Sequence, residues 1–193
     1  MCLEYFKWAK EVCFDPKKNT KKDYRYFDFV KRLATVSLVS GVAMTVMAFL
    51  TFGEELSTGD MVAWSSIFFF VPVYVIAAAI GPFVNGAIYH FFGKIVFKLM
   101  RGDYKKTYNA AAYMDVPSFM FGWIPVIGGI VSMVWGVVVG VSAFSNQHKI
   151  SRGKSLVVVL TPIAIAFVLV LLLAIFAYSY VAPLFMGSEL PSY

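Results

Sequence analysis

Residues 116–148, VPSFMFGWIPVIGGIVSMVWGVVVGVSAFSNQH, decide the fold, because these thirty-three residues hold no Asp, Glu, Lys or Arg. Basic clusters border the stretch on both sides, at residues 94–106 and 149–154. Basic residues in short loops stay on the cytoplasmic side of a membrane, so both flanks are expected on that side. The stretch therefore predicts a helical hairpin that enters the membrane and returns. We place its turn near Pro125 and Gly128-Gly129, with arms of about 24 Å each.

The composition is typical of a membrane protein rather than of a soluble domain. Of the 193 residues 60% are hydrophobic, and the mean hydropathy is +0.73. Several apolar runs are longer than about 18 residues, the length that indicates membrane spans. We expect one all-α integral membrane domain, a bundle of helices.

The net charge of +6 does not indicate nucleic-acid binding, because the basic residues are sorted along the chain. All seventeen Lys and Arg fall in three segments, with nine in residues 7–32, five in 94–106 and three in 149–154. The other polar connections carry only acidic residues, namely Glu54, Glu55, Asp60 and Glu189. This asymmetry predicts a cytoplasmic basic face whose partners are anionic lipid headgroups.

The hairpin and the charge pattern together predict five transmembrane spans, with the N-terminus cytoplasmic and the C-terminus outside. Residues 1–32 are expected to form a cytoplasmic amphipathic helix and basic segment, residues 33–182 the membrane domain, and residues 183–193 an outer tail. The second span bends at Pro72 and Gly81-Pro82, and Asp60 is a candidate N-cap for it. The approximate spans are 33–52, 61–100, 112–127, 129–146 and 156–180.

Residues 2–14 place Cys2, Phe6, Ala9 and Cys13 on one helical stripe, which predicts a short amphipathic helix. It lies either on the cytoplasmic membrane surface or against the protein's own helices, and lipidation of the two cysteines stays open. A basic segment follows, and its cations are candidates for contact with lipid or a partner, although a solvated loop without a ligand is the default. These residues are Lys17, Lys18, Lys21, Lys22 and Arg25.

Two series of small residues predict close helix packing, since small side chains let helix backbones approach each other in a membrane. One series recurs every seven residues and consists of Ala79, Gly86 and Gly93. The other recurs every four residues along the second arm of the hairpin and consists of Gly128, Ser132, Gly136 and Gly140.

Few ionisable residues lie at membrane depth, where a catalyst or transporter usually needs them. The candidate functional polar residues are His90, Asp115 and Asn85, but an interfacial histidine, a helix-start carboxylate and an interhelical hydrogen bond explain them as well. His148 follows an apolar helix in a basic loop and is expected to be solvated. No metal-ligand cluster, phosphate loop or catalytic set is present in the sequence, so we expect no enzyme, metal or cofactor.

Residues 88–160 resemble the Yip domain family, the Ypt/Rab-interacting membrane proteins and their prokaryotic relatives. Four features carry the resemblance: the histidine-containing helix end before a Gly-Asp-Tyr-Lys turn, residues 113–117 at the entry of the hairpin, its glycine turn, and the closing loop with His148, Ser151 and Lys154. The resemblance implies a five-span helical fold with a cytoplasmic N-terminus, and in eukaryotes an association with membrane traffic and Rab GTPases.

The chain departs from the eukaryotic pattern at its N-terminus. Its cytoplasmic region is only about thirty residues long and lacks an Asp-Leu-x-Gly-Pro element, while Gly81-Pro82 lies inside a span. The chain therefore resembles a prokaryotic-type member in a cytoplasmic membrane, and Rab binding is not carried over to it.

The sequence favours a non-enzymatic membrane adaptor or scaffold that acts through helix packing and cytoplasmic-face contacts with lipids, other membrane proteins or itself. One alternative is an accessory subunit of a larger membrane complex. Another is a small transporter or channel with a polar path near His90, Asn85 and Asp115.

Overall fold

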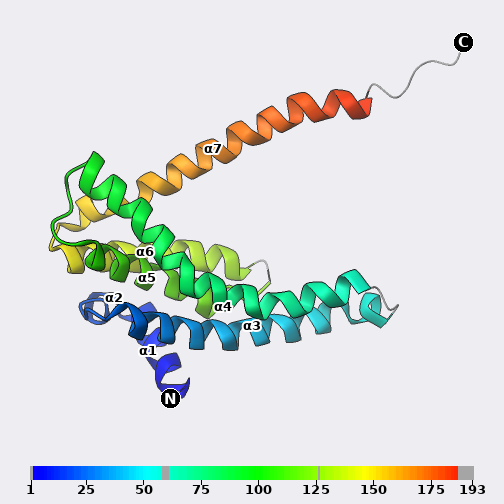
Figure 1. Ribbon diagram of the computed structural model, residues 1–193, viewed down its shortest axis with the longest axis horizontal. Helices are drawn as coiled ribbons and strands as arrows, with labels where there is room; N and C mark the ends of the chain where they lie inside the picture. The colour runs from blue at the N-terminus through cyan, green and yellow to red at the C-terminus, as the bar shows by residue number, and fades with distance from the viewer. Residues whose placement is uncertain (1, 58–60, 126, 187–193) are drawn as a thin grey trace, which may run out of the picture.

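The long apolar runs of the sequence form long helices in the computed structural model, which describes residues 2–57, 61–125 and 127–186. No strand occurs in these residues. In a bilayer only backbone that satisfies its own hydrogen bonds can be lipid-exposed, which favours this all-helical solution. The elements in chain order (Figure 1) are α1 Cys2–Phe14, α2 Pro16–Asn19, α3 Tyr26–Ser57, α4 Met61–His90, the π-helix η1 Phe91–Val96, α5 Tyr104–Phe121, α6 Ile127–His148 and α7 Arg152–Met186.

Four helical stretches of the described chain are long and apolar enough to cross a membrane. They are Tyr26–Thr51, Val71–Val96, Ile127–His148 and Arg152–Ser179. The sequence predicts five spans, and the helix that is not among the four is α5. Its 18 residues include Lys105, Lys106 and Asp115, so its composition differs from that of a lipid-facing helix.

Helix α5 is the centre of the bundle, packed against α1, α3, α4 and α6. Every residue from Thr107 to Tyr113 is buried. Ala110, Ala111 and Ala112 lie in the middle of this run, where their small side chains let the neighbouring backbones come close. A helix that is surrounded by protein does not need a uniformly apolar surface, which accounts for the polar residues of α5.

The predicted hairpin is present as α5 and α6, which pack along each other over most of their length (Figure 1). The turn between them contains Gly122, whose N–H donates to the Ser118 carbonyl at 2.9 Å, and Pro125. A Cβ on Gly128 would lie 2.1 Å from the Phe121 carbonyl oxygen. Only glycine fits at this position, so the second arm can start directly against the end of the first.

Helix α4 changes direction along its length (Figure 1), and Pro72 and Pro82 lie inside it. A proline removes one helical hydrogen bond and bends the helix, as the sequence predicts here. The expected extension to residue 100 is interrupted, because η1 ends at Val96 and Lys98 adopts a φ of 53°. The chain then turns, with Leu99 N–H and Met100 N–H both donating to the Gly93 carbonyl.

Helix α1 packs on the protein's own helices, one of the two possibilities that its amphipathic pattern left open. Trp8, Ala9, Val12 and Cys13 are buried against the bundle. Trp135 on α6 donates its indole N–H to the Cys13 carbonyl at 2.8 Å, which fixes the end of α1. The side chain of Cys2, which the pattern places on the same stripe, lies outside the described residues.

Helix α7 leaves the rest of the bundle beyond its first turns (Figure 1). Val158 and Val159 are buried near its start, and Ser155 Oγ donates to the Val141 carbonyl at 2.7 Å. From Ile165 to Tyr178 its large apolar side chains are exposed, as expected for a surface that lipid covers. Asp60 as a helix cap, and the part of the outer tail beyond Met186, lie outside the described residues.

Candidate functional site: the basic end of the bundle

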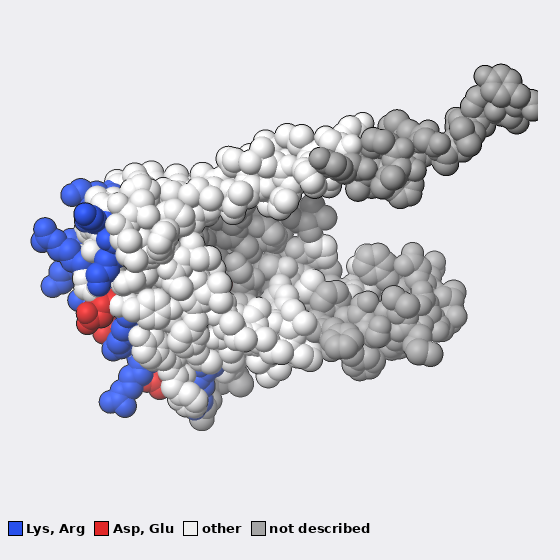
Figure 2. Space-filling view, turned by 45° about the horizontal axis from the view of Figure 1, so that its top comes forward, with Lys and Arg blue, Asp and Glu red and all other residues white. Residues whose placement is uncertain are grey.

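Lys and Arg side chains gather at one end of the molecule (Figure 2). We call this region the basic end and define it as residues 15–25, 94–106 and 146–154. It combines the segment around α2, the connection from η1 to α5 and the connection from α6 to α7. Chain segments more than a hundred residues apart in sequence therefore form one charged surface.

Helix α6 holds the N-terminal basic segment through two carboxamides. Gln147 Nε2 donates to the carbonyls of Thr20 at 2.9 Å and Lys22 at 3.0 Å. Asn146 Nδ2 donates to the Lys17 carbonyl at 3.0 Å and to Thr20 Oγ1 at 2.7 Å. These bonds satisfy backbone groups that a free loop would leave to water.

Helix α5 holds the same segment from the other side. Asn109 accepts from the Tyr24 N–H at 3.3 Å and donates to Asp23 Oδ1 at 2.6 Å. Tyr113 donates its hydroxyl to the Lys22 carbonyl at 3.0 Å, and Lys105 pairs with Asp23 at 3.2 Å. The segment expected as a solvated loop is thus anchored along its backbone.

The anchored segment displays its cations outward. Its five predicted contact residues are all exposed, namely Lys17, Lys18, Lys21, Lys22 and Arg25. Their spacing is set by the hydrogen bonds beneath them rather than by a flexible chain. The carboxamides that make these bonds escaped the sequence reasoning, because a side chain that binds a distant backbone carbonyl leaves no periodic signal.

A hydrogen-bonded chain of two histidines and a threonine connects three helices at the basic end. Thr107 Oγ1 on α5 lies 2.9 Å from Nδ1 of His90 on α4 and 3.2 Å from Nε2 of His148 on α6. His148 Nδ1 lies 2.8 Å from the Arg101 carbonyl. The expectation of a solvated His148 is wrong: its side chain is 3% exposed, because α5 and the Arg101 loop cover it.

The hydrogen-bond partners determine which nitrogen of each neutral imidazole ring carries the hydrogen. A carbonyl only accepts, so His148 Nδ1 carries the hydrogen and donates to Arg101. Its Nε2 then accepts from the Thr107 hydroxyl, and the Thr107 oxygen accepts from His90 Nδ1. The Thr107 hydroxyl thus donates to one ring and accepts from the other, and the arrangement fixes the ends of α4 and α6 against α5.

The other two candidate polar residues meet each other rather than His90. Asn85 Nδ2 on α4 donates to the two carboxylate oxygens of Asp115 on α5, at 3.1 and 3.3 Å. This is the interhelical hydrogen bond expected for Asn85. Asp115 lies in the middle of α5 and not at a helix start, so the helix-dipole explanation offered for it is wrong.

The first series of small residues is divided among different contacts. A Cβ on Gly86 would lie 3.3 Å from the Cα of Tyr108, so this glycine lies at the crossing of α4 and α5. A Cβ on Gly93 would overlap the side chain of Met100 in the turn that follows η1. Ala79 is half-buried, while the neighbouring Ala78 is fully buried.

The second series lies along the face of α6 that meets α5. Ser132 Oγ donates to the Pro117 carbonyl at 3.3 Å. A Cβ on Gly136 would lie 3.4 Å from the Met114 carbonyl oxygen, and one on Gly140 would lie 2.9 Å from the Met114 sulfur. Gly128 starts this face at the turn of the hairpin, so all four residues contact the first arm.

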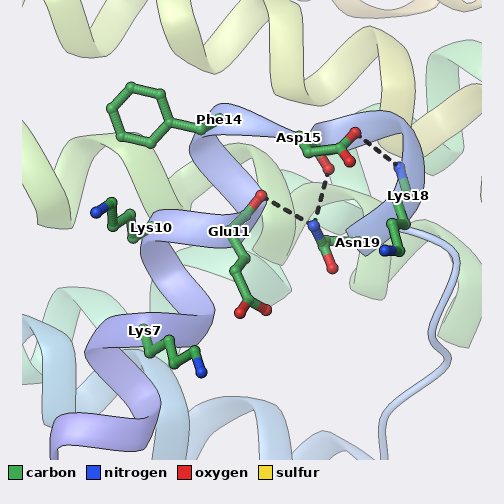
Figure 3. A pocket seen from close by; sticks show the side chains of 7 residues that line it. All are labelled: Lys7, Lys10, Glu11, Phe14, Asp15, Lys18 and Asn19. Atoms are coloured by element: carbon green, nitrogen blue, oxygen red, sulfur yellow. Dashed lines mark hydrogen bonds between the residues drawn. The ribbon is translucent and has the colours of Figure 1, made fainter.

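A groove lies between α1 and α2 beside the basic end (Figure 3). Lys7, Lys10 and Lys18 line it together with Glu11 and Asp15. Asn19 donates to the Glu11 and Asp15 carbonyls at 3.0 Å each, which closes the turn between the helices. Because both lysines and carboxylates line the groove, it is a solvated groove rather than a strong site for an anion.

An arginine at the start of α3 is enclosed by aromatic rings from the N-terminal region. The Arg32 guanidinium carbon lies 5.0, 5.4 and 4.7 Å from the ring centroids of Tyr5, Trp8 and Tyr24. Cation–π contacts of this kind contribute about 0.5–2 kcal/mol each. They add to the burial of Trp8 and join α1 to α3.

Comparison with known proteins agrees with this geometry. The family model of the Yip1 domain matches residues 28–175, which include α4, η1, α5, α6 and most of α3 and α7. Searches of curated proteins and of solved structures found no match. The match covers far more than half of the chain and confirms the resemblance in residues 88–160. The chain is therefore a multi-pass integral membrane protein that belongs to the Yip1 domain family.

Proposed function

We propose that this protein is a non-enzymatic membrane adaptor, whose basic end forms a fixed contact surface at the cytoplasmic side of the membrane. The observation that carries the proposal is the anchoring of residues 17–25 by Asn109, Asn146, Gln147 and Tyr113. A surface held by side-chain hydrogen bonds keeps its charges in one arrangement, which favours selective recognition over unspecific attraction.

The proposal includes five membrane crossings. One of them is α5, although its charged residues keep it out of the four apolar stretches. Consecutive helices α3 to α7 alternate in direction between the basic end and the opposite end (Figure 1). The 18 residues of α5 extend over about 27 Å, close to the thickness of the hydrocarbon core. An odd number of crossings puts the two termini on opposite sides of the membrane. Because the basic end is expected on the cytoplasmic side, we expect the N-terminus in the cytoplasm and the C-terminus outside.

Partners are expected at two surfaces. The exposed cations of residues 17–25 suit anionic headgroups or an acidic partner surface, each charge contributing about 1 kcal/mol near an anionic membrane. The apolar side chains of α7 beyond its first turns suit lipid, a second copy or another membrane protein. The second series of small residues serves packing within the hairpin.

Photo-crosslinking in native membranes tests the adaptor proposal. A photoreactive amino acid at Lys21 or Arg25 on the anchored segment is expected to capture discrete protein partners. The same amino acid at Leu3, which is 85% exposed on α1, serves as the control for unspecific capture. Recovery of the protein alone from both positions on the segment would contradict an adaptor.

One observation favours a transporter as the second candidate, namely the Asp115 carboxylate inside the bundle with Asn85 as its partner. Ionisable groups at membrane depth mark proton and ion paths in many transporters. Flux of a cation into liposomes that is lost in Asp115→Asn and retained in His148→Gln would favour this function. An inert reconstituted protein would exclude it.

A further inference from the structure

A hollow of about 290 Å³ lies in the basic end between the connection that follows η1 and the start of α7. Four cations line it, Lys98, Arg101, Lys149 and Lys154, together with Ser151 and two apolar residues. No carboxylate is among the lining residues. This distinguishes the hollow from the groove between α1 and α2 (Figure 3), where Glu11 and Asp15 face the lysines.

The walls of the hollow are held in place by hydrogen bonds. On one side, the Arg101 carbonyl bonds to His148, and Leu99 and Met100 bond to the Gly93 carbonyl. On the other side, Ser145 Oγ donates to the Ile150 carbonyl at 2.7 Å. The cations therefore project from fixed backbone.

Two of the lining lysines occupy a backbone conformation that costs free energy. Lys98 and Lys149 each have a φ of 53°, in the left-handed region that side chains with a Cβ rarely adopt. In the described chain they are the two residues other than glycine with positive φ, and both line the same hollow. Each of the two closes the end of a helix, since the N–H of the next residue donates back to the Gly93 or the Ser145 carbonyl. The hollow therefore lies between two capped helix ends.

The cations of the hollow have no carboxylate partner in the part of the chain that the structure describes. Among the described residues, none of its four cations forms an ion pair with a carboxylate. Four like charges around one small volume repel each other, and a multiply charged anion relieves this repulsion. A phosphate group suits the donors, because Arg binds phosphate oxygens through two parallel hydrogen bonds and Lys binds them as a point charge.

The position of the hollow identifies the source of the phosphate as a lipid. It lies where the stretch Ile127–His148 ends and Arg152–Ser179 begins, which is the membrane surface in the topology proposed above. Exposed apolar side chains adjoin it in the chain, with Ile95 and Val96 before Lys98 and Leu156 and Val157 after Lys154. A phosphate in the hollow would leave acyl chains free to lie along η1 and α7.

We infer that this hollow binds the phosphomonoester headgroup of an anionic phospholipid. The doubly charged monoester matches four cations better than a singly charged phosphodiester does. The inference deepens the proposed function, because it names a ligand for the basic end and rests on the placement of that end at the membrane surface.

Binding of soluble short-chain lipids to the full-length protein in a neutral detergent tests the inference. Dioctanoyl phosphatidic acid is expected to bind at least tenfold more tightly than dioctanoyl phosphatidylglycerol or dioctanoyl phosphatidylcholine. Inorganic phosphate is expected to bind more weakly than phosphatidic acid. Equal affinity for all three lipids would overturn the inference, and phosphate that binds as tightly as phosphatidic acid would assign the hollow to a free anion instead.

Charge-removing variants locate the site. Lys98→Asn with Lys149→Asn removes two charges and keeps residues that tolerate the left-handed conformation, and it is expected to weaken phosphatidic acid binding tenfold or more. Lys154→Gln, in regular helix, is expected to weaken it severalfold without a change of backbone. The matched control, Lys7→Gln with Lys10→Gln, removes two charges from the groove in Figure 3 and is expected to change the affinity less than twofold.

Equal weakening in the variants and in the control would show unspecific attraction and overturn the site. The outcome is separable from that of the adaptor proposal, since the crosslinking positions Lys21 and Arg25 do not line the hollow. If the protein does not prefer phosphatidic acid but still crosslinks to partners from Lys21 and Arg25, the lipid site is contradicted and the adaptor proposal stands.

Discussion

His148 at the end of α6 is bound by the hydroxyl of Thr107 on α5, with 3.2 Å between Nε2 and Oγ1. The same hydroxyl lies 2.9 Å from His90 on α4, so one oxygen joins three helices at the basic end. The bond also holds the His148 ring, whose Nδ1–H donates to the Arg101 carbonyl and thereby fixes one wall of the hollow.

Thr107→Val is expected to lower the free energy of unfolding by about 1–3 kcal/mol, because it leaves two imidazole nitrogens in the bundle without a partner. Thr107→Ser retains the hydroxyl and is expected to lose less. Thermal unfolding in detergent, followed by intrinsic fluorescence, measures the difference. Equal stability of the Val and Ser variants would show that the hydroxyl does not join the helices.

The turn of the hairpin provides a pair of adjacent glycines with opposite surroundings. A Cβ on Gly128 would meet the Phe121 carbonyl oxygen at 2.1 Å, whereas one on Gly129 would have no atom within 4 Å. Gly128→Ala is therefore expected to cost about 1–3 kcal/mol through a forced backbone shift. Gly129→Ala is expected to be neutral or stabilising by up to about 1 kcal/mol, since alanine favours the helix. The same unfolding assay compares the two, and equal losses would contradict the tight turn.

The anchoring of the basic segment predicts its resistance to protease. Trypsin cleaves after Lys and Arg, and residues 17–25 offer five such positions, but cleavage needs an extended and detached backbone. Gln147→Ala with Asn109→Ala removes the bonds to Thr20, Lys22 and Tyr24 and is expected to raise the initial cleavage rate about tenfold or more, in line with roughly 1–2 kcal/mol lost. Thr35→Ala, which removes a hydrogen bond within α3 and none to the segment, is the control. A segment cut at the same rate in all three proteins would indicate a free loop.

Burial in the interface of α1 raises the pKa of the Cys13 thiol from 9.0 to about 12. The thiol is the neutral form, so this contribution to stability is complete below pH 9 and decreases as the pH rises toward the folded pKa. In a Cys2→Ser background, the alkylation rate of Cys13 is expected to rise about tenfold per pH unit up to pH 10, because the thiolate fraction keeps growing. In sodium dodecyl sulfate the rate is expected to level off near pH 9. A native profile with the same plateau would contradict the burial.

Residue patterns predicted the parts of this fold that depend on length and local charge. The apolar runs predicted the long helices, the prolines predicted the bend in α4, and the basic flanks of residues 116–148 predicted the helical hairpin. The heptad of Ala79, Gly86 and Gly93 predicted one continuous seam, but the structure divides these residues between a helix crossing and the turn after η1. The π-helix η1 and the left-handed Lys98 interrupt the α-helical spacing on which this heptad depends. Neither feature has a signal in the sequence.

The features missed by sequence reasoning are contacts between distant segments. His148 sits among basic residues, which argues for solvent exposure, yet Thr107 and Arg101, more than forty positions earlier, enclose it. Asn109 and Gln147 bind backbone carbonyls, which every residue has, so no pattern of side chains marks the partner. The pattern of residues 2–14 left open whether that helix lies on the membrane or on the bundle, and the contacts of Trp8 with Phe29 and Tyr113 are again contacts between distant segments.

The proposed topology depends on the hairpin of α5 and α6 as two crossings, since only then do all basic segments lie on one side of the membrane. Single cysteines at Asp103, Lys149 and Ile127, in a Cys2→Ser and Cys13→Ser background, test it by labelling intact cells with a membrane-impermeant maleimide. Ile127 is 64% exposed at the turn of the hairpin, and a cysteine there is expected to label from outside. Cysteines at positions 103 and 149 are expected to label only after permeabilisation. Labelling of positions 103 and 149 from opposite sides would contradict the hairpin and, with it, the five crossings and the single basic end.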